Sequence, residues 1–377
     1  MSSIRHIDAF KGQHPRFFNQ NVDSLQKDLQ KYVKMMGKRL KKRNNIEHYT
    51  YNLQEAGTDE VYVYGRIYAG FQDDDPTEKL TEKNAEIHFI SKFENVPYLK
   101  IDYQKDVIDG LFRGQIIAAR GTVDTNVFHA SQIFTDCRTS NPTILPDDFN
   151  ARIIAVSGPY DFDTFEPLDE LNAKIKSYKP DLVIFFGPFA SQTCKQLTSK
   201  DCKYTAQELT EEVMNHLGNG IDDAIFIPSS TDLLSIPTIP RPIFPYNSDQ
   251  ILSSDPTFIT VKGDLEITAT ANDLQMLIGQ QYNGHGSKRE EIPKQIAHQC
   301  SACPAMDSTV QIQYLSSLVP ESTPHIFLSS TIFFDLISNI DGTNVIYVRQ
   351  YIKSLSFTVI NVKGNEITAE VKKDFNQ

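Results

Sequence analysis

Three short, continuous apolar runs constrain the fold of this chain more than any other feature. They are ARIIAVSG at 151–158, DLVIFFG at 181–187 and DAIFIP at 223–228. Strands that are apolar on both faces occur in parallel sheets covered on both sides, with helices in the connections. Helical stretches at 165–177 and near 210–217 separate the runs, and alternating strands follow at 257–263 and 265–271. The pattern predicts a layered α/β domain.

The N-terminal part of the chain has a different pattern. Apolar residues recur at helical spacing from Val22 to Leu40, which predicts one amphipathic helix. Between residues 59 and 135 the runs VYVYGRIYAGF, AEIHFISKF, QIIAARGTV and VFHASQIF are separated by Asp, Asn, Pro and Gly. Several short strands at this spacing predict a small barrel, best fitted by the oligonucleotide-binding (OB) type.

The chain of 377 residues is long enough to bury two cores. We expect a helix and arm over 1–50, an OB-fold barrel over 51–137, a polar linker over 138–150 and the α/β domain over 151–377.

Composition narrows the classes of function. The formal net charge of −11 argues against nucleic acid wrapped over the whole surface, although a local basic patch remains open. No apolar run has the length of a membrane span or a signal peptide, so we expect no membrane association and an intracellular protein. The five cysteines are odd in number and widely spread, which indicates reduced thiols.

Each of the three apolar runs ends in a short loop, and these loops are expected to converge because ligands gather at strand C-termini. The loops resemble those of calcineurin-like metallophosphoesterases, which carry Asp-x-His, Gly-Asp-x-x-Asp and Gly-Asn-His-Asp/Glu, then a lone His and Gly-His-x-His. That resemblance implies two metals that activate a water. The matching positions in this sequence are Gly158, Tyr160, Pro188, Ser191, Ser230, Thr231, Asp232, Ser301, Thr331 and Phe333.

Among these positions only Asp232 keeps a carboxylate. Hydroxyl and apolar groups are poor substitutes for charged oxygen or imidazole ligands, so no dinuclear centre is expected. We therefore predict no metal, no cofactor and no catalytic residue at the degenerate site.

A degenerate phosphoesterase pattern behind a barrel resembles the B subunits of eukaryotic replicative DNA polymerases. Gly158-Pro159-Tyr160 paired with Gly187-Pro188-Phe189 narrows the resemblance to polymerase alpha, and FIPSSTD at 226–232 and ITATANDLQMLIG at 267–279 agree with it. The resemblance implies a nuclear, non-catalytic scaffold subunit. It implies binding to the zinc-bearing C-terminal domain of the catalytic subunit, contact with primase through the complex, and at most weak or indirect contact with DNA.

The sequence departs from that family in two places. It starts almost directly at the helix before the barrel, so the N-terminal helical domain of larger relatives is expected to be absent. The terminal segment NVIYVRQYIKSLSFTVI also lacks the Asn-Pro-Gly-Arg turn of many relatives.

Two other functions remain open. An active metal-dependent phosphodiesterase would use a ligand set made of Asp161, Asp163, Asp232, His285 and His325. A single-strand-binding barrel would stack bases on exposed aromatics. Tyr62, Tyr64 and Tyr68 share one strand face, but core packing is the favoured interpretation of these rings.

Two further motifs have a structural and a functional interpretation. The basic run comprises Lys38, Arg39, Lys41, Lys42 and Arg43. It could contact nucleic acid or serve in nuclear import, although a solvated helix end is favoured. Cys300-x-x-Cys303 near His298 could begin a zinc site, but no second ligand pair follows at usable spacing.

Overall fold

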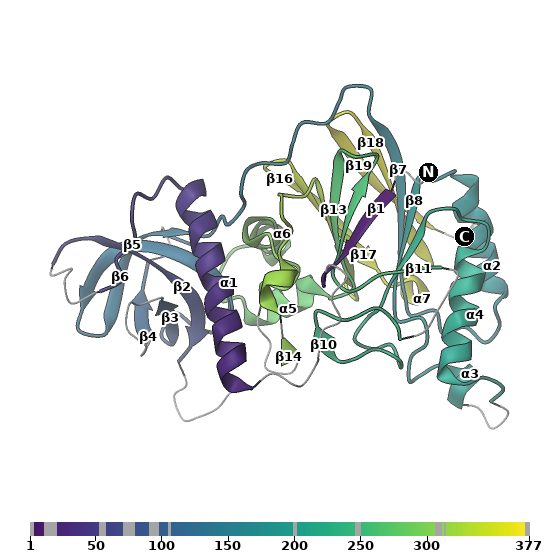
Figure 1. Ribbon diagram of the computed structural model, residues 1–377, viewed down its shortest axis with the longest axis horizontal. Helices are drawn as coiled ribbons and strands as arrows, with labels where there is room; N and C mark the ends of the chain where they lie inside the picture. Colours follow the sequence, from purple (N-terminus) through teal and green to yellow (C-terminus); the bar gives the residue numbers. More distant parts are fainter. Residues whose placement is uncertain are drawn as a thin grey trace. The chain divides into compact units, whose positions relative to one another are not determined.

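The computed structural model describes residues 4–10, 21–52, 58–70, 80–89, 98–104, 107–198, 202–245, 250–305, 311–312 and 314–373. The chain divides into two compact units (Figure 1). The sheet unit comprises Met1–Pro15, Pro142–Asp273 and Pro324–Gln377, and the barrel unit comprises Arg16–Asn141 and Leu274–Thr323. No helix in the described part of the chain combines the length and apolar character of a membrane span.

The first six-stranded sheet of the sheet unit has the order β11-β9-β8-β7-β18-β19. Its strands are β7 (Asn150–Ser157), β8 (Leu182–Phe186), β9 (Ala224–Ile227), β11 (Ile251–Leu252), β18 (Ser356–Lys363) and β19 (Glu366–Lys373). Strands β7, β8, β9 and β11 pair in parallel, and β18 and β19 join the sheet through antiparallel pairing. The described helices of this unit are α2 (Glu166–Ser177), α3 (Lys195–Thr198), α4 (Ala206–Gly218) and α7 (Tyr351–Ser354).

The second sheet has the order β1-β12-β13-β15-β17-β16. Its strands are β1 (Ile4–Asp8), β12 (Thr257–Val261), β13 (Leu265–Thr270), β15 (Ile326–Thr331), β16 (Leu336–Ile340) and β17 (Thr343–Arg349). A short strand, β10 (Thr238–Ile239), lies on the segment between β9 and β11.

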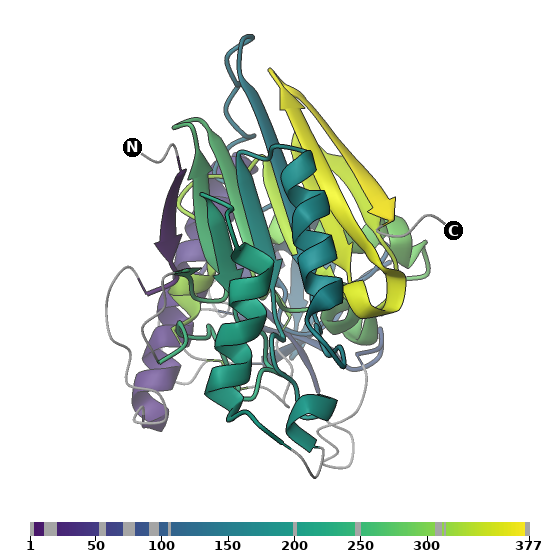
Figure 2. The ribbon, with the colours of Figure 1, turned by 90° about the vertical axis from the view of Figure 1, so that its right-hand side faces the viewer.

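The apolar runs are continuous because both faces of the first sheet are buried. On β7, Ile153 and Ala155 belong to the core shared with the second sheet, whereas Ile154 and Val156 pack with α2 and α4. Figure 2 shows these two helices lying across the first sheet. The unit is thus layered as helices, sheet and sheet, which confirms the predicted α/β domain class.

The barrel unit contains five strands that close in the order β2-β3-β4-β6-β5. They are β2 (Val61–Ala69), β3 (Ala85–Phe89), β4 (Tyr98–Asp102), β5 (Ile116–Asp124) and β6 (Val127–Phe134). Only β4 and β6 pair in parallel among these strands. A bulge in β5 at Arg120 and Gly121 brings the backbones close, since a Cβ on Gly121 would lie 2.0 Å from the His129 carbonyl oxygen.

Helix α1 (Val22–Arg43), an amphipathic helix as the apolar spacing predicted, packs on the barrel. Asn21 caps its N-terminus through a 2.8 Å hydrogen bond from the Ser24 N–H. Its buried face contains Tyr32, Val33, Met36, Gly37 and Leu40. The Tyr49 hydroxyl donates a 2.9 Å hydrogen bond to the Gly37 carbonyl, which ties the helix to the chain entering β2.

The observed units differ from the expected boundaries at two segments. Residues Leu274–Thr323 group with the barrel, and β1 from the expected N-terminal arm pairs with β12 of the sheet unit. The grouped segment contains α5 (Leu274–Gln281), α6 (Lys288–Gln299), β14 (Gln311–Ile312) and the 3-10 helix η2 (Leu315–Leu318). Buried polar contacts join this segment to the barrel. The Gln299 side chain exchanges two 2.9 Å hydrogen bonds with the backbone of Ile116. Such contacts cannot be predicted from apolar periodicity.

Strand β4 was not expected, and residues 90–93 of the strand predicted over 85–93 lie outside the described residues.

Candidate functional site

The three predicted loops meet at one edge of the first sheet. Because β7, β8 and β9 are parallel neighbours, their C-terminal ends coincide. The ladder continues into the loops: the Gly158 N–H donates to the Phe186 carbonyl at 2.8 Å and the Gly187 N–H to the Ile227 carbonyl at 2.9 Å. The loops enclose a cavity of about 510 Å³, which lies where the sequence predicted a site.

Hydroxyl groups dominate the polar lining of this cavity. They belong to Ser191, Thr193, Ser230, Thr231 and Ser235. Among the described residues, the cavity lining contains one carboxylate, Asp232, and no Lys, Arg, His or Cys side chain. Such a surface can hydrogen-bond a neutral partner, but it provides neither a cation for a phosphoryl group nor a set of metal ligands.

Asp232 holds two of the loops together. It is buried, and its two oxygens accept backbone hydrogen bonds from Phe189 at 2.5 Å and Ser229 at 2.7 Å. A Cβ on Gly187 would lie 2.1 Å from Asp232 Oδ2, so the close approach requires glycine. Burial raises the pKa of Asp232 to about 7, against the opposing backbone donors and the charge of Arg241.

Apolar packing surrounds Tyr160, the residue predicted to match the histidine of the first loop. The Tyr160 ring stacks on Phe189 with centroids 5.7 Å apart and planes inclined by 10°, and its hydroxyl donates to the Val156 carbonyl at 3.2 Å. Both side chains are buried. A Cβ on Gly158 would lie 2.4 Å from the Pro188 carbonyl oxygen, so these two degenerate positions are in direct contact.

Ser191, predicted to match a metal-ligand position, forms a hydrogen bond within the loops. Its hydroxyl donates to Asp161 Oδ2 at 2.5 Å, and the Thr193 hydroxyl reaches the same oxygen at 3.2 Å. Asp163 is exposed and forms a 3.1 Å ion pair with Lys195. Asp161 therefore orders the second loop, and Asp163 lies on the surface.

The two final degenerate positions lie at the end of β15. The Thr331 hydroxyl donates to Asp273 at 3.1 Å, and its carbonyl accepts from the N–H of Gln350, which lines the cavity. Phe333 is 46% exposed. Ser301 lies in the barrel unit, where its hydroxyl is bonded to Tyr32, so its assignment to the lone-histidine position stays a prediction.

The ligand set proposed for an active enzyme is dispersed. His325 precedes β15, about 20 Å from Thr331 along the strand. It is buried, donates from Nε2 to the Thr143 carbonyl at 2.8 Å and accepts at Nδ1 from the Glu266 N–H at 3.1 Å. Burial lowers the pKa of His325, so the ring is neutral and structural. His285 lies in the barrel unit, 3.2 Å from Glu82.

Within the described ranges, no cluster of three or more His, Cys, Asp or Glu donors lies in the convergent loops. The donor set therefore does not fit the dinuclear centre of metallophosphoesterases. At the cysteine pair, burial raises the pKa of Cys300 to about 11, which keeps that thiol protonated near neutral pH rather than ready to bind zinc.

A buried ion pair near this site was not predicted. Arg241 and Asp255 are 1% and 0% exposed and bond directly, and Arg241 also donates to the Asn272 side chain at 2.7 Å. Asp255 further accepts from the Thr270 hydroxyl at 2.7 Å. The sequence indicates this pair only through a charged residue between two prolines, Pro240-Arg241-Pro242, and that pattern does not predict which residue pairs with Arg241.

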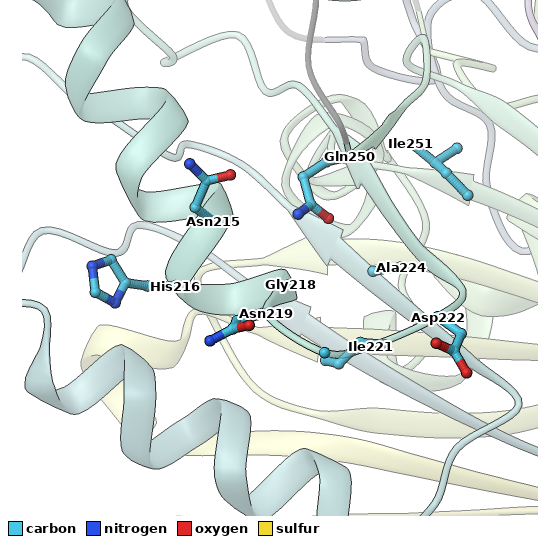
Figure 3. Close-up of a pocket in the computed structure, with 10 residues that line it drawn as sticks. Asn215, His216, Gly218, Asn219, Ile221, Asp222, Ala224, Gln250 and Ile251 are labelled. Carbon is cyan, nitrogen blue, oxygen red and sulfur yellow. The ribbon is translucent and has the colours of Figure 1, made fainter.

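A second cavity of about 550 Å³ lies where α4 ends and β9 begins (Figure 3). Its lining includes Asn215, Asn219, Asp222 and Gln250. It is slightly larger than the loop cavity, but it lies at the N-terminal edge of the parallel strands, opposite the edge where ligands bind in such sheets. We therefore place the candidate site at the loops.

The tyrosines of β2 lie outside the barrel core, to which this strand contributes Val63 and Ile67 instead. Tyr64 is buried outside the barrel, 4.4 Å from the Tyr49 ring and against Gly37 of α1. Tyr62 and Tyr68 are partly exposed. The core interpretation is thus wrong for Tyr62 and Tyr68, because residues alternate across a barrel strand and the even-numbered positions point outward.

The residues of the predicted basic run lie on different sides of helix α1 and have different surroundings. Arg43 pairs with Asp136 at 2.8 Å, and Arg39 donates to the Pro320 carbonyl at 2.8 Å. Lys38 and Lys42 are exposed, and Lys41 is partly exposed. The arginines of the run therefore have structural contacts, and the lysines point to solvent.

Fold and site define a layered α/β domain with a hydroxyl-lined cavity at the convergent loops. Residues 153–332 match the family described as the B subunit of DNA polymerases alpha and epsilon. The DNA polymerase alpha B subunit of Caenorhabditis elegans is 27% identical over 262 residues, covering 63% of this chain and 43% of that protein. That of Rattus norvegicus is 26% identical over 247 residues, covering 60% and 39%. The chain is similar in sequence to these B subunits, and its matched region spans about two fifths of their length.

Solved structures that resemble part of this structure include a novel archaeal phosphodiesterase and the protein TT1561 of Thermus thermophilus. The first has a TM-score of 0.32 and 12% identity, covering 59% of this chain and 99% of its own. The second has a TM-score of 0.35 and 9% identity, covering 60% and 100%.

Proposed function

We propose that this chain is a non-catalytic accessory subunit of a DNA polymerase alpha–primase complex and acts in the nucleus. It would bind the C-terminal domain of the catalytic subunit and support synthesis of the primer. The observation that carries the proposal is the combination of the family match over residues 153–332 with a cavity whose described lining has one carboxylate, Asp232. A hydrolase would need charged groups at that place.

We further propose that the barrel is of the OB type. Its antiparallel strands β2, β3 and β4, followed by a parallel pairing of β4 with β6, support this assignment.

Co-purification tests the main proposal. The full chain and the C-terminal domain of its cognate polymerase alpha catalytic subunit are expressed together, and the complex is isolated through a tag on the latter. We expect a stoichiometric complex, and no metal by elemental analysis of this chain purified alone. A catalytic domain that elutes alone while this chain remains folded would refute the accessory role.

Phosphodiesterase activity is measured on the same preparation. Manganese-dependent hydrolysis that disappears in Asp232→Ala would refute the non-catalytic assignment, even if the complex forms. Asp148→Ala serves as the matched control, because Asp148 is an exposed carboxylate outside the ligand set proposed for an active enzyme.

A further inference from the structure

The solvent face of α1 carries a line of lysines. Lys27, Lys31, Lys34, Lys38 and Lys42 are exposed, and Lys41 is partly exposed. Their spacing of three or four residues places them on one side of the helix, within roughly a third of its circumference. We call these six residues the lysine ridge. It extends the predicted run toward the N-terminus and excludes both of its arginines.

The ridge contrasts in charge with the rest of the molecule. Helix α1 contains eight Lys and Arg residues and two Asp residues, a net charge of +6. The whole chain carries −11, so the remainder carries −17. Among the described residues, none of the six lysines has an ion-pair partner. A concentrated positive line on an acidic protein attracts a polyanion.

The burial of the apolar face of α1 argues against a membrane surface as the polyanion that the ridge binds. Its apolar face packs on the barrel, with Tyr32, Val33, Met36 and Leu40 each at most 4% exposed. No apolar side of this described helix remains to enter a bilayer, as an interfacial membrane helix requires. The ridge, being made of lysines alone, also offers no aromatic ring on which the bases of a single strand could stack.

We propose that the lysine ridge binds the phosphate backbone of duplex nucleic acid without reading its sequence. From Lys27 to Lys42 the helix rises about 22 Å, the axial length of roughly six to seven base pairs. Ammonium groups act as point charges, which suits contacts to phosphate rather than bidentate reading of bases. The inference goes beyond the accessory role and does not depend on it, since the binding is measured with this chain alone.

The test measures binding of the full chain to a short labelled DNA duplex by fluorescence anisotropy between about 50 and 200 mM salt. The variant Lys31→Glu, Lys34→Glu, Lys38→Glu removes the centre of the ridge. We expect at least about tenfold weaker binding and a salt slope smaller by about 2 to 3, because three phosphate contacts are lost. The Lys→Gln triple at the same positions keeps helix propensity and should weaken binding in the same direction.

A matched control carries Lys203→Glu, Lys353→Glu and Lys363→Glu, three exposed lysines of the sheet unit. It changes the net charge equally and should bind within about twofold of the wild type if local contacts dominate. Equal losses in the ridge and control triples would overturn the proposal. So would tighter binding of a single strand than of the duplex, or equally tight binding of polyglutamate, which would indicate an acidic protein partner.

Discussion

Asp232 joins two of the convergent loops through its carboxyl group. Its two oxygens accept hydrogen bonds from the backbone N–H groups of Phe189 and Ser229. A carboxylate that joins two loops keeps a structural role without a metal. Burial nevertheless opposes its charge, and this opposition has a measurable consequence.

We predict that the contribution of Asp232 to the free energy of unfolding falls as pH rises from about 4 to 7. The pKa of Asp232 is about 7 in the folded chain, whereas an unfolded Asp titrates near 4. Over this window the folded state holds a proton that the unfolded state has released, so stability decreases by up to about 1.4 kcal/mol per pH unit. Denaturant unfolding of wild type and Asp232→Asn at several pH values measures the difference.

Asp232→Asn should lack this component of the slope because it has no carboxyl group to titrate. Asp163→Asn, with a side chain that is 68% exposed in the wild type, should retain the wild-type slope. Parallel pH profiles for wild type and Asp232→Asn would contradict the assignment.

At the scale of elements, the contact of α1 with the barrel depends on one small residue. A Cβ on Gly37 would lie 2.2 Å from the Tyr64 ring, which is itself buried. Alanine is the better helix former by about 1 kcal/mol, but here it would force α1 away from β2. We predict that Gly37→Ala lowers the free energy of unfolding by about 1 to 3 kcal/mol, as overpacking does.

Gly279→Ala is the matched control, because Gly279 also lies in a helix, α5. Its Cβ would meet only the terminal methyl of Ile292, at 3.3 Å. It should leave stability unchanged or raise it by up to about 1 kcal/mol. Urea unfolding measures the free energy of unfolding of both variants. Equal changes in the two variants would mean that the contact with Tyr64 does not determine which residue is tolerated at position 37.

The elements differ in how far sequence could predict them. Helix α1 and strands β7, β8 and β9 were predicted because each carries its own periodicity or apolar run. Strand β1 was missed, since the polar sequence IRHID becomes a strand only by pairing with β12. The convergence of the loops followed from parallel topology. The hydrogen-bond partners of Asp232 and Arg241 could not be predicted, because hydrogen bonds between residues distant in the chain leave no local sequence pattern.

The whole molecule combines one basic helix with an otherwise acidic chain, and the cavity at its convergent loops is lined mainly by hydroxyl groups. The small number of charged groups at that cavity determines how the molecule responds to metals. A resident metal with 100-fold saturation would stabilise the fold by about 2.7 kcal/mol. Here the fold is held at the same edge by Asp232, by the stacked Tyr160 and Phe189, and by the buried Arg241–Asp255 pair.

We therefore predict that neither Mn²⁺ nor EDTA shifts the thermal unfolding midpoint of the full chain. The described cavity lining has one carboxylate, and both of its oxygens already accept hydrogen bonds, so a cation would have to displace backbone donors to bind. Differential scanning fluorimetry with each reagent, followed by elemental analysis after dialysis, provides the measurement. One equivalent of manganese retained by wild type and lost in Asp232→Ala would contradict the prediction. The same loss in Asp163→Ala would instead trace that metal to surface carboxylates.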